Sequence, residues 1–133
     1  MTQFSKLALA KVAIEAAIEM HLSKRYVPAV VLSGAAGRIS DDLCREKGIL
    51  TALQRCTPSE IELNSRKIRT LFEELYNSAK HAERKPLEVV EVNVNESLML
   101  IQRALLDLKS LGVQDIIGVS QIFDCASSRK MNP

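Results

Sequence analysis

The chain has 133 residues, of which 47% are hydrophobic and 26% are charged, and its net charge at neutral pH is +2. This balance is that of one globular domain with a real core, and it excludes a disordered chain. Aromatic residues make up only 4% and Trp is absent. The core is therefore expected to be aliphatic, and the base-stacking platforms of many single-strand nucleic-acid modules are lacking.

A first helix is predicted from about Gln3 to Leu22, because apolar residues recur every three or four positions. Lys11, Glu15 and Glu19 form its polar ridge. They also interrupt the apolar run, so neither a signal peptide nor a membrane span is expected. His21 falls on the apolar stripe, where a single histidine is more often a hydrogen-bonded boundary residue than a ligand.

A second helix is predicted from Pro28, at the first helical position, to about Lys47, with Gly48 as its stop. Its predicted inward residues are Leu32, Ala35, Ala36, Ile39 and Leu43. The run Gly34–Gly37 inside it lacks the preceding strand and the Lys-Ser/Thr pair of a phosphate loop. We interpret these small residues as a place where a neighbouring helix approaches closely.

A third helix is predicted from the capping box Thr57–Glu60, which has Pro at the first helical position, to about His81. Its predicted inward residues are Ile61, Ile68, Leu71, Phe72, Leu75 and Ala79. At about 100° per residue, Asn77 and His81 then lie on the other side of the helix. These two side chains are expected to face solvent, a groove or a second subunit.

The segment from 82 to 95 breaks the helical pattern, and its β-branched part at 87–94 predicts an extended arm or one short strand. Asn95 is the predicted cap of a fourth helix that ends at Gly112, with inward residues Leu98, Ile101, Leu105 and Leu108. A shorter fifth helix is predicted from about Gln114 to Ser127, carrying Ile117, Ile122 and Phe123. The tail 128–133 is expected to fray. The predicted fold is all-α, an up-and-down bundle of four to five helices forming one domain over residues 1–133.

The three cysteines, Cys44, Cys56 and Cys125, are widely spaced and include no C-x-x-C pair. They indicate neither a disulfide framework nor a zinc site, so no metal or cofactor is predicted and a reducing cytoplasm is the expected location. Cys44 is predicted to be a small core residue.

Positive charge gathers around the end of the predicted third helix. Between Asn64 and Lys85 the sequence has six basic and three acidic residues, a local balance of +3: Arg66, Lys67, Arg69, Lys80, Arg84 and Lys85 against Glu73, Glu74 and Glu83. Asn77 and His81 stand four residues apart, so they share one helix face and can address one ligand. The alternative is a solvated face, with cations near a helix C-terminus and Asn77, Lys80 and His81 satisfying local backbone groups.

The pattern of helices and the run Asn77-x-x-Lys80-His81-Ala82-Glu83, followed by Arg84, Lys85 and Pro86, resemble the HEPN superfamily of helical nucleotide-binding domains. The segment Ala16–Ala36 is similar to the first helix pair of bacterial members, and the likeness covers residues 5–125. The resemblance implies a helical bundle that often dimerises, with the motifs of two subunits facing a shared cleft. In the nuclease members an Arg, a polar residue and a His serve metal-independent RNA cleavage.

The chain departs from that motif at one position. Where the motif Arg would stand, directly before Asn77, the sequence has Tyr76. A tyrosine supplies no fixed positive charge at neutral pH, and losing a phosphate clamp removes several kcal/mol of transition-state stabilisation. Arg69 and Arg84 are the candidate substitutes, although neither follows the spacing.

Three hypotheses remain. The first is a dimeric, non-catalytic or weakly active HEPN-like protein that binds a nucleotide or RNA phosphate near Asn77, Lys80, His81, Arg84 and Lys85. The second is a toxin-type ribonuclease with His81 as its base, oriented by Asn77, and with Arg69 or Arg84 as its clamp. Such members are often encoded beside a small nucleotidyltransferase partner. The third is a purely structural or partner-binding bundle.

Overall fold

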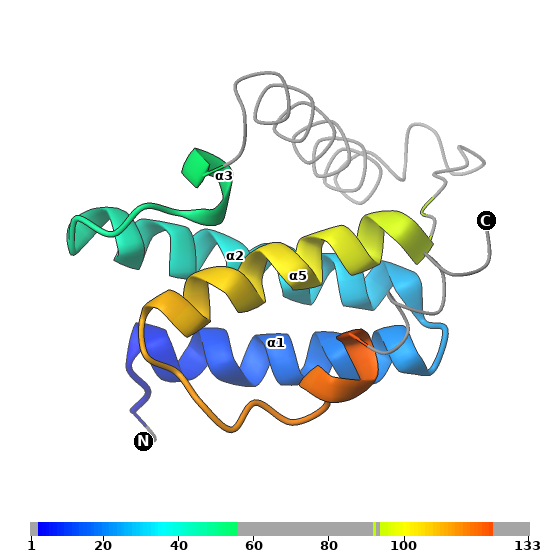
Figure 1. Ribbon diagram of the computed structural model, residues 1–133. Helices are drawn as coiled ribbons and strands as arrows, with labels where there is room; N and C mark the ends of the chain where they lie inside the picture. The colour runs from blue at the N-terminus through cyan, green and yellow to red at the C-terminus, as the bar shows by residue number, and fades with distance from the viewer. Residues whose placement is uncertain (1–2, 56–91, 93, 124–133) are drawn as a thin grey trace, which may run out of the picture.

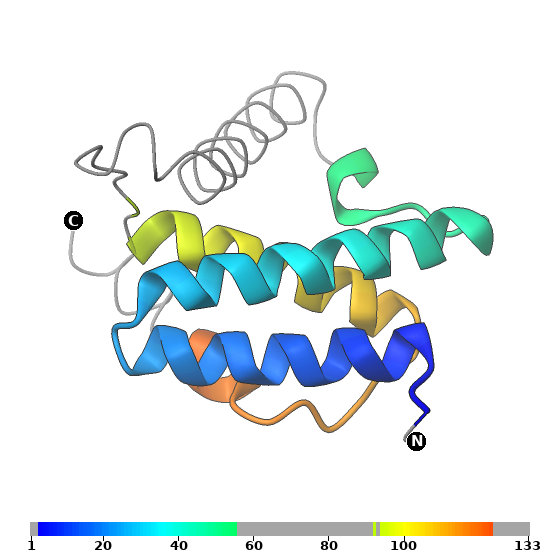
Figure 2. The same cartoon turned by 180° about the vertical axis from the view of Figure 1, so that it is seen from behind.

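The computed structural model describes residues 3–55, 92 and 94–123, and over these residues the regular structure is helical, with no strand. Its elements are α1 (Lys6–Leu22), α2 (Tyr26–Glu46), α3 (Ala52–Arg55) and α5 (Val94–Ser110). Figures 1 and 2 show α1 and α2 as an antiparallel pair, with α5 packed along both. The all-α prediction is therefore confirmed. Helix α5 runs parallel to α2, the direction that an up-and-down bundle gives to its second and fourth helices.

Helix α1 is bounded by local signals at both ends. The Ser5 hydroxyl accepts a hydrogen bond from Ala8 N–H at 3.0 Å and caps the N-terminus. At the C-terminus, Arg25 N–H donates to Met20 O (2.8 Å), and Lys24 N–H donates to His21 O (3.0 Å). This is a Schellman motif, and Lys24 occupies its left-handed position with φ of 61°.

Helix α2 begins at Tyr26, two residues before the predicted start at Pro28. Pro28 is instead the third helical residue, which it can occupy because the first four N–H groups of a helix need no intrahelical partner. The predicted stop is confirmed. Ile49 N–H donates to Cys44 O (2.8 Å), Gly48 N–H donates to Arg45 O (3.2 Å), and Gly48 has φ of 71°.

The buried face of α2 is made mostly of small and polar residues, and the predicted face is confirmed in part. Of the predicted inward residues, Ala36 is fully buried, and Leu32 and Ile39 are half-buried and pack against the core. Leu43 is half-buried, whereas Ala35 is exposed. The buried residues are Ala29, Val30, Ser33, Gly34, Ala36, Gly37, Ser40, Asp41 and Cys44. Small residues let α5 approach: a Cβ on Gly37 would lie 3.8 Å from the Cβ of Ala104. The interpretation of Gly34–Gly37 as a close approach of helices is thus confirmed.

Helix α5 is buried along two adjacent stripes. The predicted stripe is confirmed, because Leu98, Ile101, Leu105 and Leu108 are all buried. A second stripe holds Ser97, Leu100, Ala104 and Asp107. The helix begins at Val94, so Asn95 lies in its first turn rather than before it. Of the segment predicted as an extended arm, residues 87–91 and 93 lie outside the described residues.

The predicted fifth helix is wrong in its first part. Residues 113–116 have no regular structure, 117–118 form a turn, and helix is present only at 119–123. Asp115 and Gly118 have φ of 58° and 90°, which interrupts helical propagation. Of the apolar residues of the predicted helix, Ile122 is fully buried, but Ile117 is 77% exposed. Residues 124–127 of the predicted helix lie outside the described residues.

Candidate functional site

The site predicted from the sequence lies outside the described residues. This holds for Tyr76 and for every candidate site residue, namely Arg69, Asn77, Lys80, His81, Arg84 and Lys85. What the structure describes are the two flanks of this segment, α3 before it and α5 after it. Both flanks are attached to the bundle by buried polar contacts.

The N-terminal flank, α3, is fixed by a reciprocal capping box and by a carboxylate from α5. Gln54 N–H donates to the Thr51 hydroxyl (3.2 Å), and Thr51 N–H donates to the Gln54 side-chain oxygen (3.0 Å). Ala52 N–H donates to Oδ1 of Asp107 at 2.7 Å. One turn further along α5, the Ser110 hydroxyl accepts a hydrogen bond from Arg55 at 2.7 Å. The last described residues before the predicted site are therefore held against the C-terminal half of α5.

A cluster of four charged residues lies between α2 and α5, next to the contact of α3 with α5. Its members are Asp41, Arg45, Arg103 and Asp107. Asp41 accepts hydrogen bonds from Arg45 Nε (2.6 Å) and Arg103 Nη2 (3.5 Å). Burial raises the pKa of Asp107, and the negative charge of Asp41 raises it further, whereas the hydrogen bond from Ala52 opposes the shift. Asp107 Oδ2 and Arg103 Nε are buried, and neither makes a hydrogen bond.

Cys44 lies against this cluster, but it is not an activated nucleophile. Its thiol is fully buried and donates to the backbone carbonyl of Asp107 at 3.6 Å. Burial raises the pKa of the thiol, and the charges of Asp107 and Asp41 add to the effect. A buried thiol with a raised pKa is unreactive, so the prediction of a core role for Cys44 is confirmed.

The C-terminal flank of the segment is attached through His21. Its Nδ1 lies 2.8 Å from the hydroxyl of Ser97 in the first turn of α5, and both side chains are buried. The His21 ring also meets the Tyr26 ring edge-to-face, with centroids 5.6 Å apart. The predicted role of His21, a hydrogen-bonded boundary residue, is confirmed. It fixes the corner between α1 and α2 to the start of α5.

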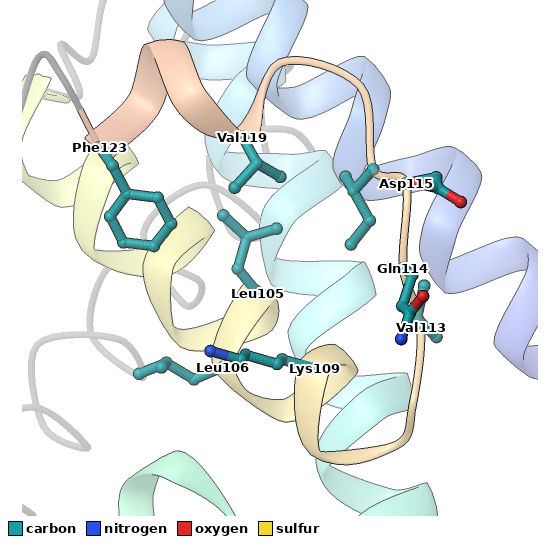
Figure 3. A pocket seen from close by; sticks show the side chains of 9 residues that line it. Leu105, Leu106, Lys109, Val113, Gln114, Asp115, Val119 and Phe123 are labelled. Atoms are coloured by element: carbon teal, nitrogen blue, oxygen red, sulfur yellow. The ribbon is translucent and has the colours of Figure 1, made fainter.

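A surface pocket of about 350 Å³ lies between α5 and the segment 113–123 (Figure 3). Six of its nine lining residues are apolar: Leu105, Leu106, Val113, Ile116, Val119 and Phe123. The other three are Lys109, Gln114 and Asp115. Sequence reasoning missed this pocket because it depends on the non-helical path of 113–118. The available signal was the apolar character of Leu106, which falls outside the predicted stripe of α5.

Within the described part of the chain, no three His, Cys, Asp or Glu side chains are grouped as a metal site would require. None of the helices described there combines the length and the apolar character needed to cross a membrane. No protein-family model, curated protein or solved structure matches this chain.

Proposed function

We propose that this chain is a HEPN-like helical protein that acts as a homodimer and binds the phosphates of RNA or of a nucleotide. The binding residues are Asn77, Lys80, His81, Arg84 and Lys85. The spacing of Asn77 and His81 on one predicted helix face, with Lys80 beside them and a local charge balance of +3, carries the proposal. Cations neutralise phosphate charge and release counterions, whereas an amide and an imidazole add oriented hydrogen bonds.

The described bundle supports this proposal, because hydrogen bonds hold both ends of the segment that carries the predicted binding residues. The segment between α3 and α5 begins next to the contact of Ala52 with Asp107 and ends next to that of Ser97 with His21. A binding segment whose two ends are fixed has less conformational entropy to lose when it engages a ligand. An all-α bundle is also the architecture that the resemblance to the HEPN superfamily implies.

The proposal includes no catalysis, because Tyr76 stands where the clamp of the nuclease members would be. His81 favours a second candidate, a metal-independent ribonuclease of the toxin type. A histidine near neutral pH can take the proton of a ribose 2′-hydroxyl. Arg69 or Arg84 would then hold the phosphate.

Fluorescence anisotropy with a labelled single-stranded RNA tests the binding proposal. The test variant is Lys80→Ala/Arg84→Ala/Lys85→Ala. The matched control is Lys6→Ala/Arg38→Ala/Lys47→Ala, which removes the same charge from exposed positions of α1, of α2 and of the residue that follows α2. Each phosphate contact contributes about 0.7 to the slope of log K against log salt for a single strand. The test variant should lower that slope by about 2, and the control should leave it unchanged. Equal losses in both variants would contradict a localised site.

A cleavage assay separates the two candidates. Purified wild type and His81→Ala are each incubated with total RNA in EDTA. Binding without degradation by either protein supports the binding role. Degradation by wild type alone would establish the ribonuclease and would lead to a test of Arg69→Ala and Arg84→Ala.

A further inference from the structure

The segment 113–123, which forms one wall of the pocket, is held in place by contacts with α1. Ile117 N–H donates to a carboxylate oxygen of Glu15 at 2.9 Å, which attaches the segment to α1. Gly118 packs so closely on α1 that a Cβ there would lie 2.6 Å from Ile18 Cγ2. Asp115 and Gly118 both have positive φ, which bends the chain between these attachments. The concave wall is therefore held by contacts far apart in the sequence.

The pocket has the size and lining of a small-ligand site. Its volume of about 350 Å³ lies at the lower end of the range of ligand pockets, about 300–1,000 Å³. At about 30 Å³ for each water-sized group, it holds roughly a dozen non-hydrogen atoms. Leu106 and Phe123 at its rim are each 47% exposed, although both are residues that gain stability from burial.

One of the residues that line this apolar pocket, Lys109, is a cation. Figure 3 shows the Lys109 side chain lying along one side, with its nitrogen between Leu105 and Leu106, whereas the Asp115 carboxylate points away from the pocket. Among the described residues, the Lys109 ammonium makes no ion pair and no side-chain hydrogen bond. A ligand that fills the pocket can therefore place an anionic group on this ammonium.

We propose that this pocket binds a small amphiphilic anion, an aliphatic carboxylate of about ten non-hydrogen atoms. The hydrocarbon body lies on Leu105, Val119 and Phe123, and the carboxylate pairs with Lys109. The proposal goes beyond phosphate binding at the Asn77–Lys85 segment and does not depend on it. A ligand of this size is expected to bind with a Kd on the order of 1 mM.

The test is a titration of the full-length ¹⁵N-labelled protein with octanoate, followed by NMR chemical shifts, in parallel with octanol and octylammonium. Octanoate should shift the amides of the pocket lining and bind about two- to fivefold more tightly than octanol, because Lys109 is exposed. Octylammonium should bind most weakly. Lys109→Met keeps the apolar stem but removes the charge, so it should bring octanoate to the affinity of octanol. The matched control is Lys47→Met, at the C-terminal end of α2, which should change neither affinity.

Val119→Trp fills the pocket and should abolish binding of all three probes. If this variant does not fold, the comparison of probes on wild type and Lys109→Met still decides the question. Equal affinity of wild type for octanoate and octanol would overturn the proposal, as would shifts confined to residues outside the lining. Shifts of the lining residues with protein concentration alone would also overturn it, because a second copy of the chain would then occupy the pocket.

Discussion

Replacing Gly118 with alanine tests the path of the segment that forms the pocket wall. Gly118 has φ of 90°, and an added Cβ would meet Ile18 Cγ2 at 2.6 Å and Ile18 Cβ at 3.6 Å. Gly48 is a matched reference, because its φ of 71° carries the same backbone strain, but nothing lies within 4 Å of its added Cβ. The two substitutions thus differ mainly in the contact with α1.

The expected costs follow from these two terms. A left-handed conformation costs an L-residue about 1–2 kcal/mol, and both alanines carry this cost. The loss of unfolded-chain entropy that accompanies Gly→Ala is also common to both. Only Gly118→Ala adds a steric overlap, and forcing a methyl group into a packed site typically costs about 1–3 kcal/mol. Gly118→Ala should therefore lower the free energy of unfolding by about 2–5 kcal/mol, against about 1–2 kcal/mol for Gly48→Ala.

The assay is urea unfolding followed by circular dichroism, with a double-mutant cycle that adds Ile18→Leu. Leucine has no Cγ2 on its β carbon, so it should recover part of the overlap in Gly118→Ala, while costing less than about 1.5 kcal/mol on its own. It should recover nothing in Gly48→Ala. Equal costs for the two alanine variants, or a cycle without coupling, would refute the close packing of Gly118 on α1.

Three further predictions concern the ends and anchors of the helices, each measured by urea unfolding. Lys24→Gly relieves a left-handed φ of 61° and should stabilise the fold by about 1 kcal/mol; no gain would mean that the turn adjusts freely. Ser97→Ala removes the hydrogen bond to His21 and should lower the free energy of unfolding by about 1 kcal/mol. An unchanged free energy of unfolding would show that this contact does not stabilise the fold. Because the pKa of Asp107 is raised in the folded state above its ordinary value of 3.8, its contribution is fully present below that value and is lost as pH rises through the folded pKa. Asp107→Asn keeps an acceptor for Ala52 N–H, so its stability relative to wild type should increase from pH 4 to pH 7, and a flat difference would contradict the shift.

The helices that the sequence predicted well carry local signals. The Ser5 hydroxyl accepts a hydrogen bond from Ala8 N–H, three residues away. Gly48 and Gly112 adopt the positive φ values that end α2 and α5. The stripe of α5 from Leu98 to Leu108 is made of large apolar residues at helical spacing, so the pattern alone identifies the buried face. In each case the determining contacts are within one or two turns of chain.

The features that sequence reasoning missed depend on contacts between distant residues. The small and polar residues on the buried face of α2 were not predicted, because periodicity weighs hydrophobicity, whereas the closest approach of α5 selects small residues such as Gly37. Asp107 becomes a buried anchor only because Ala52, 55 positions away, presents its N–H. The turn at Gly118 depends in the same way on Ile18, on a different helix. None of these partners can be identified from local pattern.

The polar contacts of α5 explain why this helix has one register in the bundle. Burial of Leu, Ile and Ala side chains changes little when one apolar stripe slides along another, so apolar packing alone selects a register weakly. Polar contacts with single partners do select one. Ser97 meets His21 near the start of the helix, Arg103 meets Asp41 in the middle, and Asp107 meets Ala52 near the end. Any sliding of α5 would break these contacts, and a buried group such as Ser97 or Asp107 that lost its partner would cost about 1–3 kcal/mol, or more when it is charged. The register therefore follows from these polar residues, and the contacts of Ser97 and Asp107 also position both flanks of the predicted phosphate-binding segment.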